Sequence, residues 1–344
     1  MADRYWVGGT GTWGSSQTTN WSAATGLSFT ASCTGTTLTT VGSPALVAGM
    51  TVFSSTHVSL GTIVSGSVNT WVVTIGGTYG SQSMSAATVG ASVPTAADNV
   101  FFDANSNSGT TAFTCTMANT PRVCNNFTAS GLDGTMTLAG TSIALNVSGS
   151  LTFQATNFTR TYTGVTTFNA TTTGKTITTN GVAFGAAVTF DGVGGGWTLG
   201  SALTISASST SLTVTNGTFD TSSVGNYAVT VPQLFSSNSN IRTINLNAST
   251  VTLSGISAIS FATPTNLTFN AGTSQINFTS SSHLDDMGGQ TFYNVSHAQV
   301  SGFVQISSTA TYNNLTFASR TSVGLGRFTY SDNQTINGLS LIHI

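Results

Sequence analysis

Asp285-Asp286 is the one adjacent carboxylate pair in the sequence, with His283 just before it and Gly288-Gly289 just after it. Two carboxyl groups about 5–10 Å apart can cleave a glycosidic bond, and an acidic pair with a histidine can also bind a cation. A solvated turn between strands uses the same residue types, because Asp and Gly favour turns. We favour the turn, and we keep Asp285 and Asp286 as the catalytic candidates should the protein be an enzyme.

The histidines and a glycine run supply no further pattern for chemistry. The histidines are dispersed, and no two have zinc-ligand spacing on a shared element: His57, His283, His297 and His343. We interpret His297 as a surface residue. The run Gly194–Gly196 precedes Trp197 and lacks the Lys-Ser/Thr of a phosphate-binding loop, so it predicts a tight turn with a packed indole. We therefore expect no cofactor and no metal ion.

Three further sets of residues have structural interpretations. Asp98 and Asp103 stand at strand boundaries, where a carboxylate ordinarily caps backbone amides. Exposed tyrosines could stack on sugars, but core or edge positions are expected for Tyr162, Tyr227 and Tyr312. The odd number of cysteines excludes a fully paired intrachain disulfide set, and we expect buried free thiols at Cys33, Cys115 and Cys124.

The scarcity of charge points to the fold class. Charged residues make up 5% of the 344 residues, with one lysine, Lys175, and no glutamate, whereas ordinary domains carry about 25%. The abundant Thr, Ser, Asn and Gly are poor helix formers, and Thr suits a pleated surface. The chain is therefore expected to be all-β. The 7 basic residues are scattered, which argues against nucleic-acid binding.

Short strands of the form apolar–Thr–apolar recur through the second part of the chain, as in Leu151–Phe153, Val188–Phe190, Val229–Val231 and Leu267–Phe269. Period-2 alternation turns the apolar pair inward and the Thr outward. Similar short strands over so long a stretch predict a parallel β-helix, or β-solenoid, with about 20–30 residues per coil. We expect it to be right-handed. Stacked amide ladders are expected inside it, with candidates Asn146, Asn169, Asn245, Asn247, Asn270, Asn277 and Asn294.

Changes of composition along the sequence indicate how the chain is organised. Residues 1–108 are expected to form an N-terminal aromatic and glycine-rich β segment, interrupted by a small β-module at about 28–88. The indoles of Trp6, Trp13 and Trp21 are expected to plug the end of the fold as a structural cap. Residues 109–344 are expected to be β-helix repeats.

The two ends of the chain carry expectations of their own. The first residues contain no apolar stretch of the kind that a secretory signal has, and no run of 18 apolar residues suggests a transmembrane helix. Residues 339–344, Leu-Ser-Leu-Ile-His-Ile, break the Thr/Asn texture and look like translated adaptor sequence. We expect the natural chain to continue past about residue 338, so that these repeats are truncated.

Two segments together resemble a known family. They are residues 4–13, RYWVGGTGTW, followed by Asn20-Trp21-Ser22, and residues 91–106, ASVPTAADNVFFDANS. They resemble the opening of tailed-bacteriophage structural proteins usually described as tail-fibre or virion-associated β-helix proteins. In that family the two segments are close in sequence, whereas here the module at 28–88 separates them. The resemblance implies a virion role and transfers no catalytic residue.

The favoured hypothesis is a non-enzymatic virion component: a tail fibre, spike or surface appendage that presents a host-binding region. The resemblance implies contacts with other virion proteins, contacts with host-surface glycan, a trimeric assembly, and release from the host by lysis. A tailspike-like glycan hydrolase or lyase centred on Asp285 and Asp286 is one alternative. A bacterial β-solenoid adhesin is the other.

Overall fold

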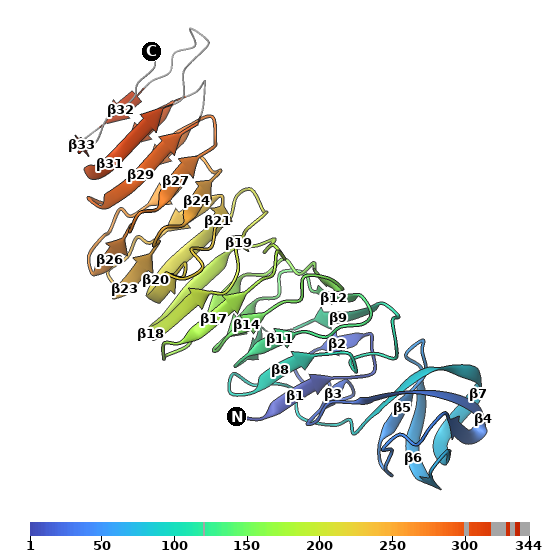
Figure 1. Ribbon diagram of the computed structural model, residues 1–344. Helices are drawn as coiled ribbons and strands as arrows, with labels where there is room; N and C mark the ends of the chain where they lie inside the picture. The colour runs from blue at the N-terminus through green and yellow to red at the C-terminus, as the bar shows by residue number, and fades with distance from the viewer. Residues whose placement is uncertain (120, 299–302, 318–327, 331–333, 338–344) are drawn as a thin grey trace. The chain divides into compact units, whose positions relative to one another are not determined.

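The computed structural model describes residues 1–119, 121–298, 303–317, 328–330 and 334–337. Every regular element in these residues is a β-strand (Figure 1). Stacked parallel strands form a β-solenoid of about 9 turns, which confirms the predicted all-β parallel β-helix. None of the described residues belongs to a helix long and apolar enough to cross a membrane. The predicted foreign segment at residues 339–344, with His343, lies outside the described residues.

The chain divides into two compact units, Met1–Gly164 and Val165–Ile344. In the first unit, parallel strands stack in register, so that Arg4 pairs with Val100, Val100 with Phe127, and Phe127 with Leu151. The strands of this stack are β1 (Asp3–Trp6), β8 (Asn99–Phe102), β11 (Phe127–Ala129) and β14 (Leu151–Thr152). A second stack holds β2 (Gly11–Trp13), β9 (Phe113–Met117), β12 (Met136–Ala139) and β15 (Phe158–Arg160), and β10 (Arg122–Cys124) pairs with β13 (Leu145–Val147).

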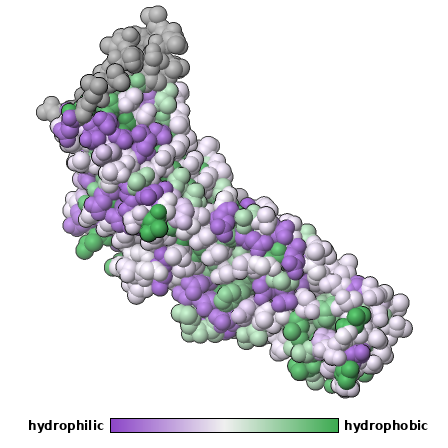
Figure 2. All heavy atoms as spheres, in the orientation of Figure 1, coloured by the Kyte–Doolittle hydropathy of each residue, from purple (hydrophilic) through white to green (hydrophobic). Residues whose placement is uncertain are grey.

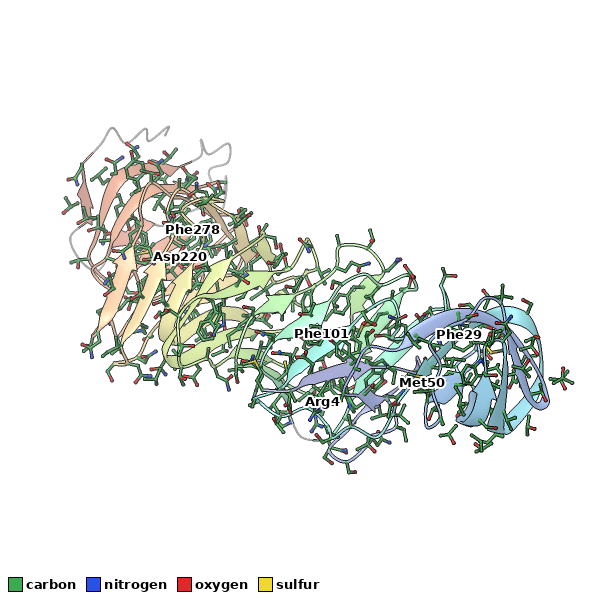
Figure 3. All side chains as sticks on the ribbon, turned by 60° about the horizontal axis from the view of Figure 1, so that its bottom comes forward. Arg4, Phe29, Met50, Phe101, Asp220 and Phe278 are labelled. Atoms are coloured by element: carbon green, nitrogen blue, oxygen red, sulfur yellow. The ribbon has the colours of Figure 1, made fainter. Side chains whose placement is uncertain are left out.

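A separate antiparallel sheet interrupts the first coil. Its strands are β4 (Leu27–Thr40), β5 (Thr51–Phe53), β6 (Ser59–Ser67) and β7 (Thr70–Ala87). Its own core includes Leu38, Val52 and Met84, and Phe29 and Met50 pack against it (Figure 3). The chain leaves the solenoid after β3 (Trp21–Ser22), which pairs with β1, and returns as β8. We call residues 27–87 the inserted module.

The second unit continues the solenoid pattern in its own stacks. One face carries β19 (Leu203–Thr204), β21 (Val229–Val231), β24 (Thr250–Leu253), β27 (Gln275–Phe278), β29 (Thr291–His297), β31 (Ala310–Phe317) and β33 (Gln334–Ile336) (Figure 1). Other stacks hold β16 (Thr166–Phe168), β17 (Lys175–Thr178), β18 (Val188–Leu199), β20 (Ser211–Asp220), β22 (Gln233–Phe235), β23 (Arg242–Asn245), β25 (Ile259–Ser260) and β26 (Leu267–Asn270). A short sheet holds β28 (His283–Asp285), β30 (Val304–Ile306) and β32 (Phe328–Tyr330).

In the apolar–Thr–apolar strands the apolar residues face the core and the Thr faces outward, as alternation requires. Val229 and Val231 are each 1% exposed, whereas Thr230 between them is exposed. Register stacks the outward residues, so that Thr204 pairs with Thr230 and Thr230 with Thr252. The outer face of this sheet therefore carries a rank of hydroxyl groups, each about 4.8 Å from the next.

The predicted interior position of the amide ladders is wrong. Asn245 and Asn270 do form a ladder with Asp220, with Nδ2 to oxygen distances of 2.9 and 2.8 Å, but it runs along the outer face. Inside the fold, hydroxyls replace amides: Ser249 donates to Thr221, and Thr221 donates to the carbonyl of Leu246. A short hydroxyl satisfies its hydrogen bonds inside a coil with less volume than an amide needs.

Candidate functional site

The catalytic candidate Asp285 lies inside the solenoid. On β28, His283 and Asp285 are both 0% exposed, whereas Leu284 between them is 43% exposed. The predicted solvated turn is therefore wrong at Asp285. Alternation explains the inversion, because β28 pairs with β30 so that His283 lies beside Val304 and Asp285 beside Ile306, at positions that face inward.

Asp285 is held as a buried acceptor. Its Oδ1 accepts hydrogen bonds from the backbone N–H groups of Ala258 and Ile259, each 2.9 Å away. Its Oδ2 lies 3.8 Å from Nδ1 of His283, which is too long for a hydrogen bond. Burial raises the pKa of the Asp285 carboxyl to about 7, and the two amide hydrogen bonds oppose that rise.

Asp286 does not join Asp285 in a catalytic pair. It is half-buried, and its Oδ1 accepts the backbone N–H of Gly288 at 3.1 Å. Successive side chains of an extended strand point to opposite sides. One carboxyl therefore lies in the core and the other toward the outer side, without a shared accessible space in which a glycosidic bond could lie between them.

His297 is a core residue, and its predicted surface position is wrong. It is 1% exposed, and its ring stacks between Phe278 at 4.5 Å and Phe317 at 5.0 Å. His283 meets the edge of this stack, 5.5 Å from His297. In-register pairing puts the three stacked residues above one another, so His297 occupies a place in an aromatic ladder. Within the described residues, no three His, Cys, Asp or Glu side chains are arranged to hold a metal ion.

The three N-terminal indoles form one cluster. Trp6, Trp13 and Trp21 are each 0% exposed, and Trp21 meets Trp6 at 5.1 Å and Trp13 at 5.4 Å in edge-to-face contacts. The Nε1–H of Trp6 donates to the carbonyl of Gly9 at 2.6 Å. Phe102 continues the cluster to Phe127 at 5.5 Å. The indoles thus fill the core of the earliest coils.

The remaining candidates have structural roles in the described residues. Asp98 accepts hydrogen bonds from the backbone of Thr95 and Ala2, and Asp103 accepts one from the backbone of Asn105. Of the tyrosines that could stack on sugars, two are buried and the third is half-buried: Tyr162, Tyr312 and Tyr227. The cysteines are free and buried, as predicted: Cys33, Cys115 and Cys124.

A groove beside the glycine run of β18 is an accessible site, among the described residues, that the sequence does not predict. Its volume is about 590 Å³. Consecutive coils of the second unit line it, with Thr173, Val193, Gly194, Gly195, Asn216, Gly217, Thr218, Ser239, Asn240, Ile241, Arg242 and Thr243. We call it the β18 groove. The predicted tight turn at Gly194–Gly196 is instead a bulge within β18, where its register with β20 shifts between Asp191 and Gly196. The Trp197 side chain is packed, at 1% exposure.

The wall of the β18 groove is fixed by close backbone contacts. Gly217 has a φ of +77°, and a Cβ there would lie 2.5 Å from the carbonyl oxygen of Gly192. A Cβ on Gly195 would approach the carbonyl of Ala170 even more closely. Only glycine permits these approaches, so the bulge is held against the coils on both sides.

Arg242 lies beneath the groove as a buried cation, and no carboxylate of the described residues pairs with it. It is 1% exposed. Its Nε donates to the Ser236 hydroxyl, Nη1 donates to the carbonyls of Asn240 and Thr265, and Nη2 donates to the carbonyls of Ser236 and Thr263, all at 2.6–2.8 Å. The five N–H groups of a guanidinium are thereby all used. Arg242 therefore ties three segments together and offers no donor to a ligand.

Sequence reasoning missed the β18 groove and the buried histidine–aspartate cluster. The glycine run can be recognised in the sequence. The residues at 239–243 that complete the groove belong to the second coil after it, and only the register between coils brings them close to the glycines. A search of family models found no match to this chain, and neither the curated proteins nor the solved structures gave one.

Proposed function

We propose that the chain is a non-enzymatic structural component of a phage virion, a fibre, spike or surface appendage that presents a binding region to the host. The observation that carries the proposal is the in-register stacking of parallel strands, as in the run from Leu203 through Val229, Val251 and Ile276 to Val295 and Leu315. Backbone hydrogen bonds join each strand of this run to the next, which makes a stiff support. The resemblance of residues 4–22 and 91–106 to phage tail proteins supplies the virion setting.

The inserted module supports contact with other virion proteins. Residues 5–97 contain no Asp, Glu, Lys or Arg. Figure 2 shows hydrophobic residues gathered on the visible face of the module. The exposed aliphatic residues there include Val41, Val47, Val58, Val64, Val68, Val72 and Ile75. An uncharged, aliphatic surface on this scale favours burial against a protein partner. We expect a trimer, and sedimentation showing a stable monomer would remove that part of the proposal.

The geometry at Asp285 favours the non-enzymatic proposal over a glycan hydrolase or lyase. A catalytic carboxyl must reach the scissile bond, but Asp285 is 0% exposed and its Oδ1 is held by two amides. Incubation with host polysaccharide should therefore release no new reducing ends. Release that is lost in Asp285→Asn would establish the enzymatic alternative.

The experiment for the virion role is to purify particles of the phage that carries this gene and to label them with antibodies against residues 1–164. We expect the protein in the particle proteome and immunogold at the tail or particle surface. A protein missing from particles but present on the surface of a bacterial cell would refute the proposal and favour the adhesin alternative.

A further inference from the structure

We propose that the β18 groove binds a neutral oligosaccharide through hydroxyl and amide groups between two exposed aliphatic side chains. The inference rests on the proposed function in one respect, namely that the protein attaches to a surface that carries glycan. It adds the place of attachment and the class of ligand.

Hydroxyl groups supply the first part of the recognition surface. Thr218 and Thr243 are paired neighbours on β20 and β23, and both line the groove. Thr173 and Ser239 line it from the adjoining turns. Within the described part of the chain, none of these four side-chain hydroxyls has a hydrogen bond to another protein group. Each can both donate to and accept from a sugar hydroxyl.

Two side-chain amides supply oriented acceptors. Nδ2 of Asn216 donates to Oδ1 of Asp191 at 2.6 Å. Nδ2 of Asn240 donates to the carbonyl of Thr215 at 3.2 Å. Each amide is thus anchored through its nitrogen, and its Oδ1 is left for a donor outside the protein. A preoriented acceptor loses little entropy when it binds a hydroxyl group.

Two aliphatic side chains complete the site. Val193 is 72% exposed and Ile241 is 80% exposed, and both line the groove. A single exposed valine or isoleucine needs no explanation. Two such side chains bordering one set of hydroxyls match a sugar ring, which presents C–H groups on its faces and hydroxyls around its edge.

The charge of the site selects a neutral ligand. Among the described residues that line the groove, Arg242 alone carries a charge, and its N–H groups are all directed at protein acceptors. The exposed carboxylate of Asp191 lies beside the groove, since it accepts the hydrogen bond from the side chain of Asn216. A sialic or uronic acid would meet no available cation and would face this carboxylate. Acidic glycans and acidic peptides are therefore disfavoured.

The test is an array that displays neutral hexose and N-acetylhexosamine oligosaccharides beside sialylated and uronic-acid oligosaccharides, probed with the full 344-residue chain. The best neutral oligosaccharide is then titrated calorimetrically against Val193→Ser/Ile241→Ser. Val224→Ser is the matched control, because Val224 is 94% exposed and does not line the groove. We expect at least about tenfold weaker binding in the groove variant and unchanged binding in the control. Unchanged thermal melting in both variants shows that folding is intact.

Three results would overturn the inference: no binding to any neutral oligosaccharide, preference for the acidic ones, or neutral binding that the groove variant leaves unchanged. A second groove variant, Asn240→Ala, should weaken binding as well, since it removes an anchored acceptor. Particle labelling is independent of these variants. If the particles are labelled but no oligosaccharide on the array binds, the inferred ligand is wrong and the proposed function stands. If the array is positive but the particles are unlabelled, the proposed function is wrong and the inferred ligand stands.

Discussion

Replacing Asp285 by Asn should stabilise the coil around β28 at pH 8 and leave it nearly unchanged at pH 4. The carboxyl has a pKa of about 7 in the folded protein because it is buried, against an ordinary value of 3.8. Between pH 4 and pH 7 the folded protein therefore keeps a proton that the unfolded chain has lost. The free energy of unfolding falls as pH rises through this window and levels off above pH 7, by a total of about 4 kcal/mol.

Asparagine removes this dependence because it does not ionise. Its Oδ1 can still accept the hydrogen bonds that Ala258 and Ile259 now give to Asp285. At pH 8 the variant should gain stability of the order of the same 4 kcal/mol, reduced by any relaxation that hydrates the carboxylate. At pH 4 both side chains are neutral, and the two proteins should differ little.

Hydrogen exchange followed by mass spectrometry is the assay, because a long repeat protein need not unfold in one step. Peptides covering 256–262 and 283–288 are compared between the two proteins at the same pH, which cancels the intrinsic pH dependence of exchange. Asp286→Asn serves as control, because it removes the adjacent carboxyl from the outer side. Equal or weaker protection of Asp285→Asn at pH 8 would refute the reasoning. It would mean that an ionised Asp285 is stabilised, with His283 as the obvious partner at 3.8 Å.

Three further changes test the packing. Trp13→Ala should lower the free energy of unfolding by about 3–5 kcal/mol, because the indole is 0% exposed. Hydrogen exchange should show this as lost protection in residues 1–22 and 99–117. Arg242→Lys should lower the free energy of unfolding by at least about 2 kcal/mol, because an ammonium has three N–H groups for five acceptors. A lower melting temperature would show this loss, and an unchanged melting temperature would contradict the role of Arg242. Cys115 and Cys124 should resist thiol reagents until the protein unfolds, because burial raises the pKa of both thiols; rapid labelling of the native protein would disprove their burial.

The candidate sites show where sequence reasoning stopped. The sequence correctly predicts the buried cysteines, the capping aspartates and the packed Trp197, because each depends on neighbours close in sequence or on side-chain type alone. The sequence predicts surface positions for Asp285 and His297, because charged and polar side chains usually lie there. The structure puts both in the core, where an adjacent strand and an aromatic stack set their direction. Sequence spacing carries no information about either neighbour.

Composition and period-2 alternation by themselves determined that this chain is all-β, that it stacks in coils, and that Thr faces out between inward apolar pairs. Only the tertiary structure decided which residues meet across coils. Leu212 pairs with Leu234, and Leu234 with Ile259, so successive coils differ in length. The turns absorb these differences, and a shift of one residue in a turn would exchange the inward and outward faces of the strand that follows. The β18 groove and the buried Asp285 exist because backbone hydrogen bonding between coils fixed that register.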